Sequence, residues 1–491
     1  MSLRIPFLLA SAAALALAAC SSGAPTDANQ SSASSIDASQ VSDKDLEKQV
    51  TAALADAPKH GLTRDLFLKG DLPSDGPARR QALIGAISEY ASALANGKVD
   101  PTKVREVYTV PRNKTDVRQG LTQALQQGKL QEYLDSLAPQ TAEYRALSDA
   151  FVQLVKRSPG LPDINIPDGN ALKPGQSDPR VAAIVANLKA QGYVQVAGDP
   201  KDSKQPVAPT THYSGAVVQA VKQWQADSGL KPDGVIGPDT IKALNASPRD
   251  RARQIAVAME RLRWLDRNPP ATRIDVNTAA TFLDYFRDGQ AIDHRKVIAG
   301  EQGRETPQLG APIFQLVANP TWTVPHSIDE EMAGKSQAWL SANGFTQKDG
   351  QWVQASGDKN SLGIVKFDMK DDQAIYLHDT PAKAIFAMDE RHRSHGCVRV
   401  EDAIGFAHML AMADGIDDKF SEAMATGKET FVKLNHEIPV RLMYHTAYLG
   451  TDGRVHFAAD VYGWDNDVAA ALGYPTMARA QVKTEGGDVG P

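Results

Sequence analysis

The sequence predicts a multi-domain α+β protein with a helical N-terminal scaffold, a three-helix module and a mostly-β C-terminal domain. The chain has 491 residues, too many for one hydrophobic core, so two to four domains are expected. Before residue 157, apolar residues recur at three-and-four spacing, which is typical of amphipathic helices. After residue 252, short alternating segments are separated by Gly, Pro and Asp-Gly, which favours a β-sandwich or barrel over a parallel sheet.

The first 19 residues have the composition of a secretory signal peptide. Arg4 is their only charge, and the apolar run from Phe7 to Ala19 is short for a membrane span but suits a signal. The run ends Leu-Ala-Ala-Cys20, which resembles the lipobox of bacterial lipoproteins, where the cysteine is lipidated. We therefore expect a signal peptide at 1–19 and a lipid on Cys20; the alternative is an ordinary signal with a chance cysteine. Two serines and no Asp follow Cys20, so the expected location is the periplasm, lipid-anchored to the outer membrane.

Composition narrows the function classes. Hydrophobic residues make up 42% of the chain, as in ordinary globular proteins, and the formal net charge is -6. A nucleic-acid binder would need a basic surface, so no nucleic-acid partner is expected. Of the two cysteines, Cys20 takes the lipid, which leaves Cys397 without an intramolecular disulfide partner in an oxidising compartment. Such a free thiol is either buried and inert or functional.

The N-terminal half divides by composition. Residues 20–41 are serine-rich and predict a flexible tether, and 42–157 predict a helical scaffold domain. In the segment 80–94 one helix face is apolar; it comprises Leu83, Ile84, Ile87, Tyr90, Ala91 and Leu94. A Pro/Gly-rich stretch within 158–177 breaks the pattern and predicts a linker.

Residues 178–247 predict a small helical module. Helices are expected over 179–191, from Gly215 to Gln225 and over 238–244, with a polar insert at 201–213 and a tight turn at Asp233-Gly234. The run Trp224-Gln225, then Gly-Leu, Asp-Gly-Val-Ile-Gly and Thr-Ile-Lys-Ala-Leu-Asn resembles the three-helix peptidoglycan-binding domain. That resemblance implies a glycan partner; the alternative is a scaffold that no longer binds glycan.

The C-terminal domain is expected at 252–470, followed by a flexible tail at 471–491. Strands are predicted at 273–277, 280–286, 294–299, 364–369 and 374–378, with a hairpin turn at Asp288-Gly289. The stretch 327–349 is helical and turn-like in character, with Trp339 and Trp352 near its end. We interpret about 327–355 as an insertion that caps one end of the sheet.

The candidate chemistry lies in two segments, Tyr376 to Pro381 and Ser394 to Val400. A thiol is mostly protonated near neutral pH, and a nearby imidazole can take its proton. His378 and His395 are both candidates for this base. The turn at Gly396 and Cys397 could aim consecutive backbone N–H groups at the oxyanion of a tetrahedral intermediate.

A His, fifteen residues, and then Ser-His-Gly-Cys with a following hydrophobic residue resembles the signature of L,D-transpeptidases of the YkuD-type fold. Further similarity lies at 297–307, 319–325 and 438–447, and suggests the large multi-domain branch. The resemblance implies Cys397 as nucleophile and His378 as base, with the backbone carbonyl of Asp379 orienting it. It places His395 and Gly396 in the oxyanion turn.

Substrate binding is the more open part of the site. The candidate substrate-binding residues are Arg399, Ser394, Tyr376 and Trp322. Many members of the family carry Asn where this chain has Arg399. Two roles therefore stay open for Arg399: binding of a substrate carboxylate, or pairing within the fold.

The implied reaction is attack on the L-to-D peptide bond of a tetrapeptide stem, release of D-alanine and transfer to an amine, giving 3-3 cross-links. The implied partners are peptidoglycan stems and glycan strands, with carbapenems as covalent inhibitors and no organic cofactor or metal. Three alternatives stay open. The same nucleophile could serve an L,D-carboxypeptidase, the chain could be a non-catalytic wall-binding lipoprotein, or His378, His392, His395 and Cys397 could ligate zinc. The polar run around His392 predicts that this side chain is solvated.

Overall fold

The structure is a computed structural model that describes residues 36–157, 164–194, 211–228 and 230–477. The predicted signal peptide, Cys20 and most of the tether lie outside the described residues, as do parts of the predicted linker, polar insert and tail. In the part of the chain that is described, no helix combines the length and the apolarity that a bilayer crossing requires.

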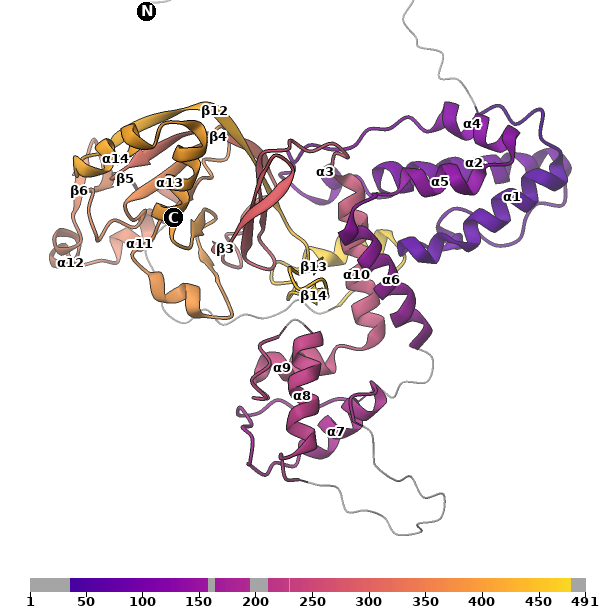
Figure 1. Cartoon of the computed structure of the whole chain (residues 1–491), viewed down its shortest axis with the longest axis horizontal. Coiled ribbons are helices and arrows are strands. Elements are labelled where there is room, and N and C mark those ends of the chain that lie inside the picture. Colours follow the sequence, from indigo (N-terminus) through magenta and orange to yellow (C-terminus); the bar gives the residue numbers. More distant parts are fainter. Residues whose placement is uncertain (1–35, 158–163, 195–210, 229, 478–491) are drawn as a thin grey trace, which may run out of the picture. The chain divides into compact units, whose positions relative to one another are not determined.

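The N-terminal region is helical, as predicted (Figure 1). Helix α2 (Gly76–Asn96) begins where the Asp75 carboxylate accepts a hydrogen bond from the backbone N–H of Ala78, with a proline in the first turn. The expected apolar face is buried, except that Ile84 is only partly covered. The other helices are α1 (Asp43–Ala55), α3 (Pro101–Val104), α4 (Arg118–Gln127), α5 (Leu130–Leu137) and α6 (Ala142–Arg157), with short 3-10 turns at Ala57–His60 and Arg64–Leu66.

Two helices from distant parts of the chain complete this N-terminal core. Helix α10 (Pro248–Trp264) packs beside α6 (Figure 1), and α15 (Asp465–Ala471) also reaches the scaffold. Val257, Trp264, Val468 and Leu472 all belong to the scaffold core. The predicted domain start at 252 therefore does not coincide with a break in packing.

The expected flexible tail is wrong for its first residues. Leu472 is buried, and the Tyr474 hydroxyl donates to the carbonyl of Gly61 at 3.1 Å. The apolar side chains at 472 and 474 anchor this stretch to the scaffold, which short-range pattern could not indicate.

The small helical module consists of α7 (Val181–Ala190), α8 (Ala216–Asp227) and α9 (Pro238–Asn245). Its core comprises Ile184, Leu188, Trp224, Ile236 and Leu244, among others. The buried Gln225 amide accepts from the Gly234 N–H at 2.9 Å and donates to the Val235 carbonyl at 2.9 Å. Gln225 of the aromatic-Gln pair therefore fixes the Asp-Gly turn that the sequence predicts.

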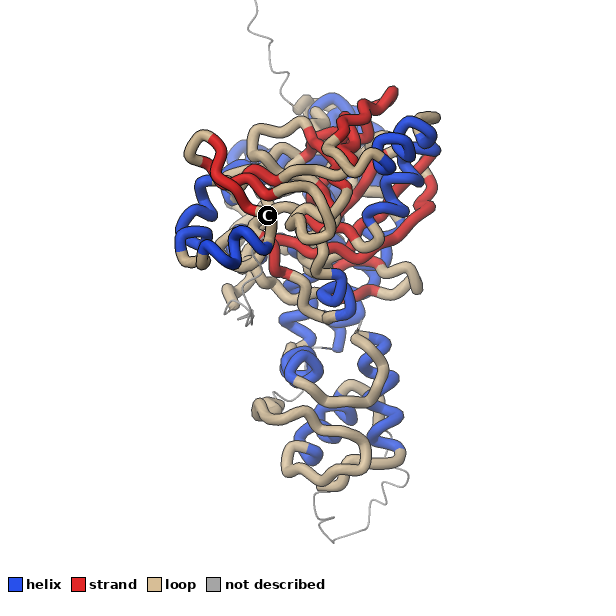
Figure 2. The backbone as a smooth tube through the Cα atoms, turned by 90° about the vertical axis from the view of Figure 1, so that its left-hand side faces the viewer, coloured by secondary structure: helices blue, strands red, loops and turns tan. Residues whose placement is uncertain are grey.

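The C-terminal domain is built on one sheet with the strand order β10-β3-β11-β9-β8-β4-β12-β1-β2. Strand β3 pairs with β2 as well as with β11, so the sheet closes into a barrel (Figure 2, strands in red). Its strands are β1 (Arg273–Asn277), β2 (Phe282–Arg287), β3 (Gln290–Gly300), β4 (Gly310–Ala318), β8 (Val365–Met369), β9 (Leu377–His378), β10 (His392–Ser394), β11 (Val398–Val400) and β12 (Thr430–Met443). The expectation of a barrel-like domain is confirmed.

Individual strands follow the prediction closely, with one exception. The β2–β3 turn has positive φ at Asp288 (52°) and Gly289 (82°), which is the backbone that an Asp-Gly hairpin needs. The strand predicted over 374–378 is only two residues long, because Ala374 takes φ 55° and bends the chain before β9. Alternation alone cannot reveal such a bend.

The barrel core is filled from one face by two helices, α13 (Ala403–Asp414) and α14 (Asp417–Ala425). Phe406, Leu410 and Phe420 lie in the same cluster as the inward residues of the strands. The remaining elements are a 3-10 turn at Lys383–Ala387 and the hairpin of β13 (Ala447–Leu449) and β14 (Val455–Phe457).

The region predicted to be a capping insertion contains more β-structure than expected. Strands β5 (Trp322–Thr323), β7 (Gln351–Gln354) and β6 (Phe345–Lys348) form a separate sheet in that order. Short helices α11 (Asp329–Ala333) and α12 (Gln337–Ala342) and a 3-10 turn at His326–Ile328 complete it. We call residues 322–362 the cap. Its own core contains Trp322, Val324, Ile328, Met332, Leu340, Phe345 and Leu362, with Trp339, Trp352 and Tyr376 packed against it.

Candidate active site

Strands β9 and β11 bring the candidate catalytic residues together. The two strands are parallel, with Leu377 opposite Val398 and His378 opposite Arg399. Leu377 and Val398 point into the barrel core. Because side chains alternate along a strand, Tyr376, His378, Cys397 and Arg399 share the opposite face.

The thiol of Cys397 is held in a nearly closed environment. Its residue is 6% exposed, and Sγ lies 3.9 Å from the carbonyl oxygen of Ala374. Burial raises the pKa of Cys397 to about 11, although hydrogen bonds to the backbone and hydroxyl of Tyr376 and the charge of Lys366 oppose the rise. The Cys397 side chain is therefore a neutral thiol at neutral pH.

The imidazole of His378 is equally enclosed. Burial and then the nearby Arg399 guanidinium lower the pKa of His378 to about 3, and the backbone groups of Asp379 and Leu362 only partly oppose this. Among the described residues, neither ring nitrogen makes a hydrogen bond of ordinary geometry. His378 is thus a neutral imidazole with a nitrogen able to accept a proton, and its orientation by the Asp379 carbonyl stays a prediction.

The turn before Cys397 is fixed by hydrogen bonds that use its own residues. The Ser394 hydroxyl donates to the carbonyl of Cys397 at 2.5 Å and accepts from the Gly396 N–H at 3.2 Å. The Thr306 hydroxyl donates to the Gly396 carbonyl at 2.8 Å and accepts from the Gly300 N–H at 2.8 Å. Gly396 has φ 121°, where a side chain would be strained. The sequence therefore builds a rigid turn around the nucleophile.

The residues predicted to bind substrate are mostly covered in this arrangement. Arg399, Ser394 and Trp322 are buried, and Tyr376 is partly buried. Ser394 acts within the turn, and Trp322 packs at the centre of the cap against Phe345. Of these four side chains, Tyr376 alone keeps part of its surface while also lying against the thiol.

The prediction that His392 is solvated is wrong. Its ring is buried, with Nδ1 2.5 Å from Glu390 Oε1 and Nε2 2.8 Å from the Thr278 carbonyl oxygen. His395 points elsewhere, with Nε2 3.0 Å from Glu331 Oε1. In the stretches that the structure describes, no three His, Cys, Asp or Glu side chains are grouped as a metal site. Of the histidines named for the zinc alternative, His392 and His395 therefore have carboxylate or carbonyl partners, whereas His378 has neither among the described residues.

Three residues at this site have no role in the sequence analysis: Lys366, Thr306 and Glu331. Lys366 Nζ lies 4.3 Å from the centre of the Tyr376 ring, on the strand next to β9. The alternation of polar Lys366 with apolar Val365 and Phe367 predicts that Lys366 lies on the face of the strand opposite the barrel core. Glu331 approaches His395 across 64 residues of sequence, and nothing local indicates that contact.

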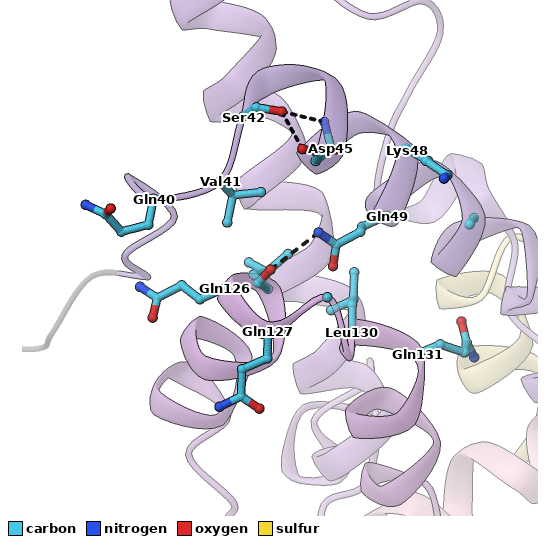
Figure 3. A pocket seen from close by; sticks show the side chains of 13 residues that line it. Gln40, Val41, Ser42, Asp45, Lys48, Gln49, Gln126, Gln127, Leu130 and Gln131 are labelled. Carbon is cyan, nitrogen blue, oxygen red and sulfur yellow. Dashed lines mark hydrogen bonds between the residues drawn. The ribbon is translucent and has the colours of Figure 1, made fainter.

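Two cavities lie away from the thiol. One, of about 770 Å³, is lined by Glu143, Leu262, Asp275, Arg441 and His445, among others. The other, of about 550 Å³, lies between α1 and the α4–α5 connection and is lined by five glutamines (Figure 3). In it the Gln49 amide donates to the Leu125 carbonyl at 3.3 Å. Neither lining includes Cys397.

Sequence profiles of three families match consecutive parts of the chain. Residues 41–151 match a "Scaffold domain", 177–244 a peptidoglycan binding domain, and 271–424 the L,D-transpeptidase catalytic domain named YkuD. A protein of Haemophilus influenzae that is named as a candidate L,D-transpeptidase is 32% identical over an alignment of 224 residues, and the match covers 40% of this chain. The chain spans 45% of the length of that curated relative.

Solved structures were also found to be similar. An L,D-transpeptidase from Xylanimonas cellulosilytica (residues 123–326) is 16% identical, with 56% of this chain and 98% of that chain covered and a TM-score of 0.19. An L,D-transpeptidase from Mycobacterium smegmatis is 12% identical, with 35% and 58% covered and a TM-score of 0.21. TM-scores of this size do not by themselves establish a common fold.

Proposed function

We propose that this chain, whose residues 271–424 are an L,D-transpeptidase catalytic domain of the YkuD family, cross-links peptidoglycan stems with Cys397 as its nucleophile. The observation that carries the proposal is the shared face of two parallel strands on which Cys397 and His378 lie beside a rigid Gly-containing turn. A peptidoglycan binding domain in the same chain supports a substrate in the cell wall.

In the first half-reaction the Cys397 sulfur attacks the carbonyl carbon of the L-to-D bond in a tetrapeptide stem. His378 takes the thiol proton and returns it to the leaving amine, so that the C–N bond breaks and D-alanine departs. A thioester then joins the stem to Cys397. In the second half, an amine of a neighbouring stem attacks the thioester, its proton passes through His378, and the thiol is regenerated.

The neutral resting state suits this sequence of events. A thiol with a pKa of about 11, on the same face as an imidazole with a pKa of about 3, is expected to stay neutral in the resting state rather than to form a thiolate–imidazolium pair. Proton transfer is therefore expected to accompany attack on the bound carbonyl, when the negative charge moves to the substrate oxygen. The proposed donors to that oxygen are the backbone N–H groups of Cys397 and Gly396. The Gly396 N–H can serve only after it leaves the Ser394 hydroxyl.

The location and the anchoring belong to the same proposal. The cell-wall chemistry places the enzyme outside the cytoplasm, in the periplasm. We propose the lipid on Cys20 and outer-membrane sorting from the leader sequence alone. We also propose that residues 178–247 hold glycan strands near the catalytic domain.

The decisive experiment incubates the protein with a disaccharide-tetrapeptide and follows products by mass spectrometry. Loss of one D-alanine with formation of a 3-3 dimer supports the transpeptidase. Cys397→Ala should give neither product, and a carbapenem should add its mass to the wild type only. If only free tripeptide forms at high acceptor concentration, the enzyme is an L,D-carboxypeptidase. If the alanine variant still turns over stems, the nucleophile is wrong.

A further inference from the structure

The cap and the catalytic turn are joined by a carboxylate. Glu331 lies on α11 of the cap, and its Oε1 and Oε2 are 3.0 and 3.3 Å from His395 Nε2. Arg304, in the loop after β3, places Nη2 2.5 Å from the same carboxylate and Nη1 3.3 Å from Glu301. A single carboxylate therefore binds two cationic or hydrogen-donating groups on the barrel side.

His395 depends on this contact for its orientation. The His395 side chain is 8% exposed, and its Nδ1 has no hydrogen-bond partner among the described residues. Among the described residues, Glu331 is the only polar partner of the His395 ring. His395 directly precedes Gly396 and Cys397, so a ring that changes position disturbs the backbone that presents the nucleophile.

The placement of α11 is itself determined by the cap core. Met332, next to Glu331, is completely buried in the cap core together with Ile328. The same cluster includes Tyr376, which also contacts the Cys397 thiol. The cap is thus connected to the residues around Cys397 by two sets of contacts. Tyr376 packs against the cap core and contacts the thiol, and Glu331 binds His395. Cys397 and His378 are both buried, so a peptide can reach them only if some of the surrounding residues move.

From this geometry we propose that Glu331 is a positioning residue that holds the cap on the catalytic turn and fixes His395 in it. The inference rests on the proposed function, which supplies the acylation step by which it is measured. It assigns Glu331 no contact with the reacting atoms. Loss of its carboxylate is expected to loosen the cap, which should speed alkylation of Cys397, and to misplace the turn, which should slow acylation by a carbapenem.

The test compares Glu331→Leu, Glu331→Gln and the matched control Glu330→Leu, whose exposed neighbouring side chain points to solvent. The first measurement is the rate of carbapenem acylation by intact mass. Glu331→Leu should lower it roughly tenfold, less than the ~10²–10³ that loss of an oxyanion donor costs, because the donors remain but are less well aligned. The amide oxygen of Glu331→Gln can still accept from His395 Nε2–H, so this variant should recover part of the rate.

The second measurement is alkylation of Cys397 by iodoacetamide, a small reagent that needs access but no oxyanion turn. Here Glu331→Leu should react faster than the wild type, by up to roughly tenfold, since one lost hydrogen bond to a charged group shifts a closed–open equilibrium by about that factor. Opposite changes in the two rates would not result from general destabilisation. Should Glu331→Leu fail to fold, Glu331→Gln carries both comparisons.

Wild-type rates in both measurements for the Glu331 variants would overturn the inference, as would an equal effect of Glu330→Leu. If the wild type itself does not react with carbapenem or stems, the proposed function fails. The alkylation comparison still decides the role of Glu331 in that case, because it requires no turnover.

Discussion

The ionisation of Cys397 in the resting enzyme gives a prediction that can be measured without substrate. Burial raises the pKa of the thiol from 9.0 to about 11. At pH 7 the thiolate fraction is then ~10⁻⁴, against ~10⁻² for an unperturbed thiol, a difference of about 100-fold. Since the thiolate is the reactive species, alkylation by iodoacetamide should be slower than that of a free peptide thiol by at least that factor.

The pH profile separates ionisation from access. Limited access of the reagent to Cys397 lowers the alkylation rate by a factor that changes little with pH. Ionisation of the thiol, in contrast, should raise the alkylation rate about tenfold per pH unit from pH 6 to pH 9. The assay follows the mass of the intact protein over time at each pH, with Cys397→Ala as a blank and a cysteine peptide as reference. Cys20 is the other cysteine of the chain, so the Cys397→Ala blank separates the mass added at Cys397 from any mass added at Cys20.

A rate that already reaches a plateau between pH 6 and pH 8 would refute this reasoning. Such a plateau would indicate a thiolate–imidazolium pair in the resting state, which is not expected because burial and then the Arg399 charge lower the pKa of His378 to about 3. In the same experiment His378→Ala should leave the resting alkylation rate almost unchanged but should slow carbapenem acylation by ~10²–10⁴-fold, the usual contribution of a general base.

Three further predictions concern the turn, the scaffold and acid stability. Thr306→Val keeps the shape of the side chain but removes its hydrogen bonds to the Gly396 carbonyl and from the Gly300 N–H, so carbapenem acylation followed by intact mass should slow by roughly tenfold; Thr306→Ser, which keeps the hydroxyl, should restore the rate. Glu260→Ala should lower the free energy of unfolding by ~3–5 kcal/mol in urea denaturation, because Glu260 pairs with buried Arg263 and accepts from the Val99 N–H, whereas Glu89→Ala at an exposed pair should change it by less than ~0.5 kcal/mol. Burial lowers the pKa values of His60, His378 and His445 to about 4, 3 and 3, so below pH 6.5 the unfolded chain binds more protons than the folded one, and each histidine should lower the free energy of unfolding by ~2 kcal/mol by pH 5. Glu143, whose pKa burial raises to about 7, acts in the opposite direction. Replacement of one of these groups by His445→Phe should therefore make the urea midpoint less dependent on pH between 6.5 and 5.

Much of the fold follows from local pattern. The alternation in 273–277 and the Asp-Gly turn at 288–289 specify β1 to β3, and the three-and-four spacing of 80–94 specifies α2. These are signals of period and turn chemistry, which act over a few residues. The strands of the cap were missed because Phe345–Lys348 and Gln351–Gln354 are short and polar on most positions, so helix and strand patterns do not differ there.

Contacts between segments that are distant in the sequence could not be predicted from local pattern. The completion of the scaffold core by α15 joins residues about 400 positions apart, and His392 is buried because Thr278 and Glu390 satisfy both of its nitrogens. A polar stretch of sequence is predicted to be solvent-exposed unless the distant hydrogen-bond partners of its side chains are known. At the active site, the pairing of β9 with β11 is the step that turns two separate motifs into one face.

That pairing also explains why the site is neutral at rest. Parallel register sets His378 opposite Arg399, and a buried guanidinium beside an imidazole disfavours its protonation. The thiol, one step along the same face, is therefore not stabilised as an anion by a charged His378. In the proposed mechanism, a buried neutral thiol reacts little before substrate binds, and in the proposed oxidising compartment it is also less readily oxidised than a thiolate. Under the proposed function, the cap would serve two purposes: it would protect the thiol before substrate arrives, and it would exclude water from the thioester that forms afterwards.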